Sequence, residues 1–162
     1  MIALNRILVP HDFSDTSDAA IKYAVALAKT FGAKLHVLHV GEKVKADMAT
    51  EFPLGLDAST EVAIRERLLK ILSPLDQKEL QPEFHVLAGT PYVEILTYAK
   101  ERDIDLIVMG THGRGFVGHV VMGSVAEKVV RHAPCPVMTV HNSERVFVVP
   151  EKIAEPEVRA AL

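Results

Sequence analysis

Short, largely apolar runs recur along the first 140 residues of the chain and alternate with longer amphipathic segments. The runs lie at residues 7–10, 35–40, 84–88, 106–109 and 137–140. Within each run apolar positions mostly follow one another and do not alternate strictly with polar ones, which is typical of strands covered on both faces. The pattern predicts five buried strands.

The segments between these runs carry apolar residues at the spacing of a helix. Four such segments occur, and their apolar positions are Ala20, Ala24, Leu27 and Phe31; Ile64, Leu68, Leu72 and Leu75; Ile95, Leu96 and Ala99; and Ala126, Val129, Val130 and Ala133. We therefore expect each segment to form one helix whose apolar side packs onto the sheet.

Residues suited to cap helices mark the ends of these segments. Ser14 is a residue type that commonly caps a helix N-terminus, and Gly32 is suited to end the same helix. Thr90 precedes a proline at the start of the third helix. Ser124 and Glu127 have the spacing of a capping box, which predicts that Ser124 caps the fourth helix.

The order of these elements predicts an α/β fold. Strands that alternate with helices connect through right-handed crossovers, so we expect a single doubly wound domain with a parallel sheet and helices on both faces. Ligands of such sheets bind beyond the carboxyl ends of the strands, where the strand order reverses. This rule selects the loops at residues 10–14, from Val40 onward and at 110–123.

Composition and charge narrow the classes of partner. The chain has 162 residues and a net charge of -3, so it lacks the basic excess that favours nucleic acid or an anionic membrane surface. No apolar stretch has the length of a transmembrane helix or fits a signal peptide. Cys135 is the only cysteine, which favours a reducing compartment. The expected location is the cytoplasm.

The segment at residues 110–124 is the richest in glycine and reads GTHGRGFVGHVVMGS. It directly follows a predicted strand and directly precedes a predicted helix. Glycines let the backbone approach a ligand closely, and a helix N-terminus presents N–H groups and a partial positive charge. Arg114 adds a cation to this loop. We therefore expect the loop to bind an anionic group such as a phosphate.

Two familiar nucleotide-binding motifs overlap this loop but fit it incompletely. Gly113, Gly115 and Gly118 match G-x-G-x-x-G, yet no helix opens at these glycines and no acidic residue follows about 20 residues later. Gly118 and Gly123 have the spacing of a Walker A loop, but serine follows where that motif has lysine. Neither a dinucleotide-binding domain nor a P-loop hydrolase is favoured.

A third pattern, G-x2-G-x9-G-S, begins at Gly110 and ends at Ser124. With it the chain resembles the universal stress protein family, in its ATP-binding branch. The resemblance covers about residues 4 to 141 and also rests on VP at 9–10, DFS at 12–14, VMGTHG at 108–113, GSVAE at 123–127 and APCPV at 133–137. It implies a five-stranded parallel sheet with the strand order 3-2-1-4-5.

The resemblance also implies a role for each residue of the expected site. Asp12 would bind the ribose hydroxyls or a Mg2+ or Mn2+ ion that accompanies the nucleotide, and Pro10 and the backbone around Val40 would face the adenine. Gly110 would lie under the ribose. The phosphates would be surrounded by Gly113, Arg114, Gly123, Ser124 and the backbone of Val125.

Several of these residues also have simpler roles. Asp12 is a common turn residue ahead of a helix cap, although its place in a ligand-binding loop favours ligand contact. Ser124 can cap a helix and still contact phosphate. His11 and His112 flank the expected pocket, where contact with phosphate or ribose is favoured over catalysis. The spacing of a zinc site is absent from the other histidines considered, which are His36, His39, His85 and His132.

Three functions remain open. The favoured one is a sensor without enzymatic activity, in which ATP, ADP or AMP alters dimerisation or partner binding. The second is slow, metal-dependent ATP hydrolysis or phosphotransfer, for which Asp12, His112 and Arg114 supply charge but no clearly placed base. The third is a protein-interaction module with an empty pocket, which the intact glycines disfavour.

Domain limits and oligomeric state complete the expectations. Residues 1–141 are expected to form the nucleotide-binding domain, and residues 142–162 a C-terminal extension of unknown role. The resemblance implies a homodimer, because the last strand of the family often pairs with its twin in a second copy. Such pairing would also cover the apolar strand at 137–140.

Overall fold

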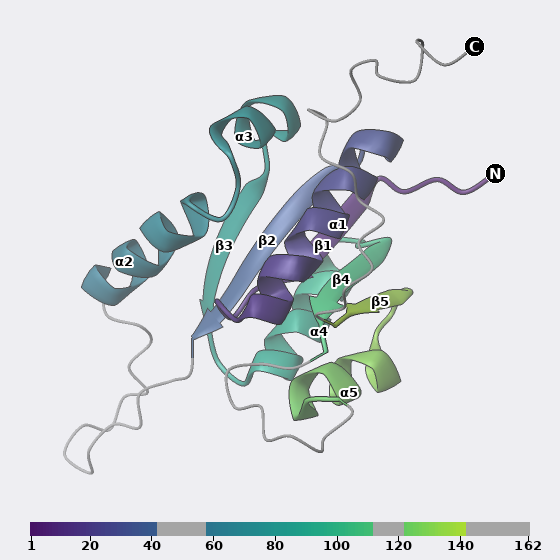
Figure 1. Ribbon diagram of the computed structural model, residues 1–162. Coiled ribbons are helices and arrows are strands. Elements are labelled where there is room, and N and C mark those ends of the chain that lie inside the picture. Colours follow the sequence, from purple (N-terminus) through teal and green to yellow (C-terminus); the bar gives the residue numbers. More distant parts are fainter. Residues whose placement is uncertain (42–57, 112–121, 142–162) are drawn as a thin grey trace.

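The computed structural model describes residues 1–41, 58–111 and 122–141. Strands and helices alternate along this part of the chain (Figure 1). Their bounds are β1 (Arg6–Pro10), α1 (Asp15–Phe31), β2 (Lys34–Gly41), α2 (Ala58–Leu69), α3 (Pro74–Leu80), β3 (Glu83–Ala88), α4 (Pro91–Glu101), β4 (Leu106–Gly110), α5 (Ser124–His132) and β5 (Val137–Val140).

The five strands form one parallel sheet with the order β3-β2-β1-β4-β5. This order confirms the doubly wound α/β fold predicted from the alternation of strands and helices. It reverses between β1 and β4, which pair in parallel with Ile7 opposite Leu106 and Leu8 opposite Ile107. The carboxyl ends of β1 and β4 therefore form the edge where doubly wound domains bind their ligands.

Helices cover both faces of the sheet. Side chains of α1 and α2 pack with Ile7, Val9 and Val37 in one buried cluster, and α1 lies in front of the sheet in Figure 1. The helices α4 and α5 pack with Leu8, Leu38 and other residues in a second cluster on the opposite face. Two buried layers against one sheet explain why the central strands read as nearly continuous apolar runs.

The edge strands differ from the prediction of complete burial. Every residue of β3 and the first three residues of β5 are only partly buried, whereas the four residues from Ile7 to Pro10 in β1 are fully buried. An edge strand has a neighbour on one side only, so helices and strands cover less of it. Strict burial is thus limited to the middle of the sheet.

The expected second helix is in fact two helices. The segment was predicted to run as one helix through Leu72 and Leu75, but α2 ends at Leu69 and α3 begins at Pro74. Ser73 caps α3 by accepting a hydrogen bond from the N–H of Asp76, and proline fits the first position of a helix while breaking the continuation of an earlier one. A Ser-Pro pair therefore ended the helix despite an uninterrupted apolar period.

The helix ends agree with the predicted caps at three places and differ at one. Ser14 caps α1 by accepting a hydrogen bond from the N–H of Ser17, and Gly32 ends α1 in the left-handed conformation with φ of 64°. Thr90 is the N-cap residue of α4, although its side chain makes no cap hydrogen bond. Ser124 was predicted to cap α5, but Gly123 occupies the cap position and Ser124 is the first helical residue.

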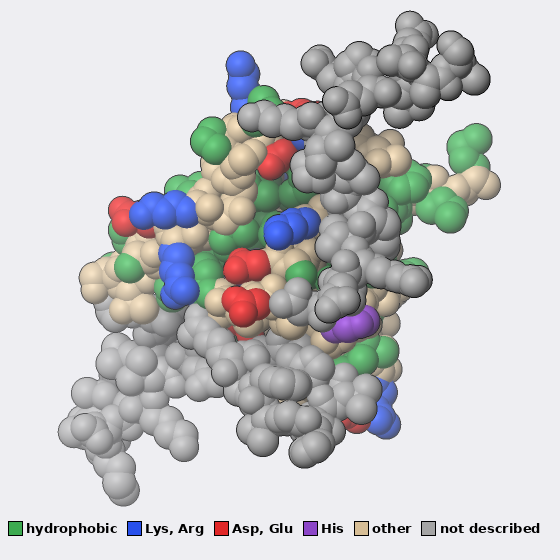
Figure 2. Space-filling view, in the orientation of Figure 1, with side chains coloured by type: hydrophobic (Ala, Val, Ile, Leu, Met, Phe, Trp, Pro, Cys, Tyr) green, Lys and Arg blue, Asp and Glu red, His purple; other side chains and the backbone are tan. Residues whose placement is uncertain are grey.

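Two further properties bear on the class of protein. Within the described ranges, no helix combines the length and the apolar character needed to cross a membrane. On the face shown in Figure 2, acidic and basic side chains are interspersed, with no large area of a single sign among the coloured residues.

Candidate functional site

The candidate site lies at the carboxyl ends of β1 and β4. Beyond Pro10, the N–H of His11 donates to the carbonyl of Leu38 at 2.8 Å and so holds the start of the β1–α1 loop against β2. Beyond β4, the N–H of Thr111 donates to the carbonyl of Val140 at 2.8 Å. Backbone hydrogen bonds to neighbouring strands therefore position both loops as they leave the sheet.

Asp12 is held by the cap of α1. Its Oδ1 atom accepts hydrogen bonds from the Ser14 hydroxyl at 2.5 Å, the Ser14 N–H at 3.1 Å and the Ser17 hydroxyl at 2.7 Å. Burial alone would raise the pKa of Asp12, but these hydrogen bonds, with a smaller contribution from His11, lower it below its usual range. The side chain is therefore a fixed carboxylate at neutral pH.

His11 is buried beside Asp12 and forms part of the same loop. The N–H of Phe13 donates to His11 Nδ1 at 3.1 Å, so the ring proton lies on Nε2, which donates to Asp18 Oδ1 at 3.1 Å. Burial lowers the pKa of His11, although the nearby carboxylates of Asp18 and Asp12 oppose that shift. A neutral, fully engaged ring of this kind orients the loop.

Phe13 and His39 form an aromatic support under the loop. Phe13 has a φ of 64°, which turns the chain sharply between β1 and α1. Its ring lies 4.8 Å from that of His39, and the Arg67 guanidinium of α2 lies 4.1 Å from its centre. His39 Nδ1 donates to the His11 carbonyl at 2.7 Å. These contacts connect the Asp12 loop to β2 and α2.

Gly110 ends β4 directly against the first turn of α1. A Cβ atom at this position would lie 2.6 Å from Thr16 Oγ1 and 2.8 Å from the backbone carbonyl carbon of Thr16. Such distances leave no room for any side chain. The family resemblance implied that Gly110 lies under a ribose, whereas the described contacts give a separate reason for glycine here, which is the close approach of α1 to β4.

The N-terminus of α5 reaches the same edge of the sheet. The N–H of Gly123 donates to the Thr111 carbonyl at 2.6 Å, which ties the cap residue of α5 to the chain just after β4. Glycine offers no capping side chain, and the first intrahelical bond runs from the N–H of Glu127 to the Gly123 carbonyl at 2.9 Å. The first-turn N–H groups, including those of Ser124 and Val125, thus belong to a helix end without a side-chain cap from residue 123.

The remaining predicted residues divide into two groups. Val40 lies at the end of β2, opposite Leu87 of β3, and the N–H of Gly89 closes that end by donating to the Gly41 carbonyl at 3.0 Å. Outside the described residues lie His112, Gly113 and Arg114, together with residues 42–57 of the loop that follows Val40 and the extension 142–162. The structure thus brings Pro10, Asp12, Val40, Gly110, Gly123, Ser124 and Val125 to the carboxyl edge of the sheet.

Sequence reasoning missed four residues that shape this edge. Ser17 donates to Asp12, Thr16 packs against Gly110, Thr111 accepts from Gly123, and Arg67 stacks on the Phe13 ring. Ser17 and Thr16 lie in the first turn of the helix that follows the Asp12 loop. Hydroxyl residues at such positions often bond to a nearby carboxylate, so the sequence could have predicted their role. Arg67 comes from a helix far along the chain, and no local pattern links it to Phe13.

The arrangement combines two features of opposite charge preference. A fixed carboxylate lies at the end of β1, and it suits hydroxyl donors or a hard cation. Across the β1–β4 switch point, the N-terminus of α5 suits an anion because its N–H groups and dipole favour negative charge. A ligand that carries hydroxyl groups at one end and phosphates at the other matches both features.

Known proteins with related sequences share this fold. The universal stress protein family matches residues 3–141 of the chain. Universal stress protein YxiE of Bacillus subtilis is 37% identical over 147 residues, which covers 84% of this chain and 98% of YxiE. The structure of universal stress protein UspA from Lactobacillus plantarum has a TM-score of 0.70 and 30% identity, covering 86% of this chain and 99% of UspA.

A third comparison concerns a protein with a bound ligand. The crystal structure of a universal stress protein in complex with cAMP has a TM-score of 0.63 and 24% identity, and the alignment covers 88% of this chain and all of that chain. At this identity the likeness concerns the fold. The family match over residues 3–141, together with the shared fold and the sequence identity to YxiE and UspA, gives one conclusion: the chain belongs to the universal stress protein family.

Proposed function

We propose that this protein binds ATP, or a related adenine nucleotide, at the β1–β4 switch point and acts as a nucleotide-dependent regulatory module. The observation that carries the proposal is that the Asp12 carboxylate and the N-terminus of α5, which has no side-chain cap, lie at the same edge of the sheet. Adenine nucleotides carry ribose hydroxyls, which suit the carboxylate, and phosphates, which suit the helix N-terminus. The cAMP bound by one structural neighbour agrees with this ligand class.

Each half of the nucleotide has a suitable partner. The first turn of α5, with Ser124 and Val125, would bind the phosphates through its N–H groups, and Gly113 and Arg114 would complete that region. The Asp12 carboxylate would accept hydrogen bonds from the ribose hydroxyls. Pro10 and the end of β2 at Val40 would face the adenine ring, an apolar surface that suits its flat face.

A divalent ion fits this arrangement only as a partner of the nucleotide. Mg2+ and Mn2+ prefer oxygen ligands, and Asp12 is a carboxylate that stays ionised at neutral pH. It is one carboxylate, and its Oδ1 atom already accepts three hydrogen bonds from Ser14 and Ser17. Phosphate oxygens and water would therefore supply most of the ligands, with Asp12 adding charge.

We infer that binding, and not catalysis, is the main activity. Phosphoryl transfer needs an aligned nucleophile and a group to orient it. Among the described residues of this edge, His11 is committed to Phe13 and Asp18, and Asp12 to the α1 cap. Turnover of ATP is therefore expected to be far below the roughly 1 to 100 per second of typical kinases. A metal-dependent rate in that range, lost in Asp12→Ala or His112→Ala, would make the protein an enzyme.

Calorimetric titration of ATP with Mg2+ tests the site directly. Asp12→Asn and Asp15→Asn each remove one negative charge near the start of α1, and Asp15 is exposed. If charge alone mattered, both variants would bind the anionic nucleotide as well as the wild type or better. If Asp12 contacts ribose or metal, Asp12→Asn weakens binding about tenfold or more, a loss of about 1.4 kcal/mol, while Asp15→Asn does not.

Two results would count against the proposal. Equal affinity of both aspartate variants and the wild type would remove Asp12 from the site. Failure of the wild type to bind ATP, ADP or AMP at millimolar concentration would remove the nucleotide function itself. In that case the remaining alternative is a nucleotide-free interaction module built on the same fold.

A further inference from the structure

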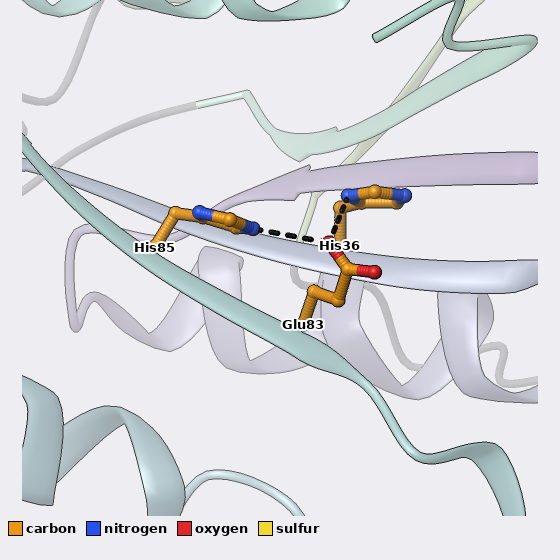
Figure 3. A group of neighbouring side chains, drawn as sticks. All are labelled: His36, Glu83 and His85. Carbon is orange, nitrogen blue, oxygen red and sulfur yellow. Dashed lines mark hydrogen bonds and ion pairs between the residues drawn. The ribbon is translucent and has the colours of Figure 1, made fainter.

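A second cluster of polar side chains lies near the amino-terminal ends of the strands, away from the switch point. His36 comes from β2, and Glu83 and His85 come from β3 (Figure 3). Strand pairing places His36 opposite Glu83, and residues two apart in a strand share a face, so all three side chains lie on one face of the sheet. That face is the one covered by α4, because His36 also contacts Tyr98.

The three side chains converge on one point. Glu83 Oε2 lies 3.4 Å from His85 Nε2 and 3.7 Å from His36 Nδ1, and one ligand atom from each residue lies within 4.8 Å of the others. Figure 3 shows the carboxylate between the two rings. Ligand atoms around a tetrahedral zinc ion, each about 2.0 to 2.2 Å from the metal, are separated by about 3.3 Å. The distances from Glu83 Oε2 to the two ring nitrogens, 3.4 and 3.7 Å, are close to that value.

Hydrogen bonding alone explains the cluster poorly. A hydrogen bond between a ring nitrogen and a carboxylate is usually about 2.7 to 3.0 Å, shorter than either distance to Glu83 Oε2. His36 has a side chain only 5% exposed, yet its Nε2 atom has no hydrogen-bond partner among the described residues. Its Nδ1 atom faces the cluster, within 2.9 Å of the Tyr98 hydroxyl. The hydrogen bond to Tyr98 orients the ring so that Nδ1 also faces Glu83, and it leaves the buried Nε2 atom without a partner among the described residues.

We propose that His36, Glu83 and His85 bind a divalent transition metal ion, for which Zn2+ is the best match. Two imidazoles and one carboxylate form a common zinc ligand set, and three protein ligands leave a fourth position for water. Side chains of His85 and Glu83 are 27% and 41% exposed, so an ion can enter from solvent. Both strands are part of one sheet, which holds the ligands in place.

Two neighbouring groups disfavour binding of the ion, so their substitution should raise the affinity for Zn2+. The Tyr98 hydroxyl lies 2.9 Å from His36 Nδ1 and competes for that nitrogen, so Tyr98→Phe should raise the affinity for Zn2+. Lys34 Nζ lies 3.7 Å from Glu83 Oε1, and its positive charge repels a cation. Lys34→Gln should likewise raise the affinity, by about two- to tenfold at low salt.

The ion would attach the edge strand β3 to its neighbour β2. A ligand that binds the folded chain but not the unfolded one raises the melting temperature by mass action. Zn2+ should therefore stabilise the protein. The cluster is separate from the nucleotide site, because His36 precedes Val40 by four residues of strand, or about 13 Å. Metal binding at the cluster should therefore leave ATP affinity unchanged.

The test is a titration of Zn2+ into the full chain after chelator treatment, without nucleotide, followed by calorimetry and thermal melting. We expect one equivalent to bind the wild type and to raise the melting temperature. His85→Ala and Glu83→Gln alter partly exposed residues and should weaken binding at least tenfold while keeping the circular dichroism spectrum. His132→Ala alters an exposed histidine of α5 and serves as the matched control, and Asp12→Asn controls for the nucleotide site.

The outcomes divide cleanly. Loss of binding in His85→Ala and Glu83→Gln, with retention in His132→Ala and Asp12→Asn, supports the site. Binding that survives both cluster substitutions, or that is lost instead in either control, overturns it. We expect a dissociation constant of about 1 μM or lower, so the site should be filled at about 100 μM Zn2+. Absence of detectable binding at that concentration also overturns the proposal.

Discussion

Gly110 and Thr16 are packed so closely that a Cβ atom on Gly110 would lie 2.6 Å from the Thr16 hydroxyl oxygen. The contact joins the end of β4 to the first turn of α1, and that turn carries the hydrogen bonds to Asp12 from Ser14 and Ser17. The β4 end and the acidic loop are therefore positioned by one another. A change at Gly110 is expected to act on both.

Gly110→Ala should destabilise the protein and weaken nucleotide binding together. The added methyl group also meets the Thr16 backbone carbon at 2.8 Å, so α1 must shift, which typically costs about 1 to 3 kcal/mol. Because that contact is with the backbone, adding Thr16→Ala should restore only part of the loss. Urea denaturation measures the free energy of unfolding for all three chains. Full rescue by Thr16→Ala would show that the clash is confined to the side chain.

The cap assignments predict a contrast between two serines. Ser14 caps α1, so Ser14→Ala should lower the free energy of unfolding by about 1 kcal/mol. Ser124 is the first helical residue of α5, so Ser124→Ala should change it by no more than about 0.5 kcal/mol, although it should weaken ATP binding. Denaturation and calorimetry on both variants check this. Equal destabilisation by the two changes would return Ser124 to the cap position.

The sequence predicted the strands and their order of occurrence well because buried strands leave continuous apolar runs. It also located Ser14 and Gly32 at the ends of α1, since caps have strong local residue preferences. It failed at α2 and α3, where the apolar period continues across Ser73 and Pro74 and hides the break. Local punctuation outweighed periodicity there.

Contacts across the sheet were beyond the reach of local patterns. The need for glycine at residue 110 arises from Thr16, on the helix that follows β1, and the cluster of His36 with Glu83 and His85 joins two strands. Spacing along the chain suggested no zinc ligands, because His36 lies in β2 whereas Glu83 and His85 lie in β3, with α2 and α3 between these strands in the sequence. Strand pairing, which periodicity does not supply, brings such residues together.

Asp105 should make stability depend on pH in acid. Its Oδ2 atom accepts hydrogen bonds from the N–H groups of Asn5 at 2.7 Å and Arg6 at 2.9 Å. The Asn5 bond is the largest of the effects that lower the pKa of Asp105, and burial opposes them. A carboxyl group with a lowered pKa contributes stability that is present above its unfolded pKa and lost as the pH falls through its folded pKa.

Asp105→Asn should therefore reduce stability at pH 7 and flatten its decline at lower pH. The wild type should lose the contribution of Asp105 as the pH falls below about 4, the ordinary range of an aspartate. Denaturation curves at several pH values between 7 and 3 measure the difference between the two chains. A difference that stays constant across this range would mean that the carboxylate charge has no part in holding the start of β1.

The final strand supports a prediction of homodimerisation. β5 pairs with β4, and its other edge has no partner strand among the described elements. The carbonyls of Pro136 and Val140 bond toward β4, and backbone groups alternate in direction, so the N–H of Thr139 points to the open edge. Thr139→Pro should give monomers by light scattering at tens of micromolar, while Thr139→Ala should remain dimeric. A wild-type monomer would contradict the prediction.

The most direct test of the central claim is the mapping of amide chemical shifts in the labelled protein as ATP and Mg2+ are added. Binding at the β1–β4 switch point should shift the amide signals of Asp12, Ser14, Gly110, Ser124 and Val125, while signals of His36 and Glu83 at the other end of the sheet stay in place. Saturating nucleotide that leaves the first five signals unchanged, or shifts only those at the opposite end, would contradict the account.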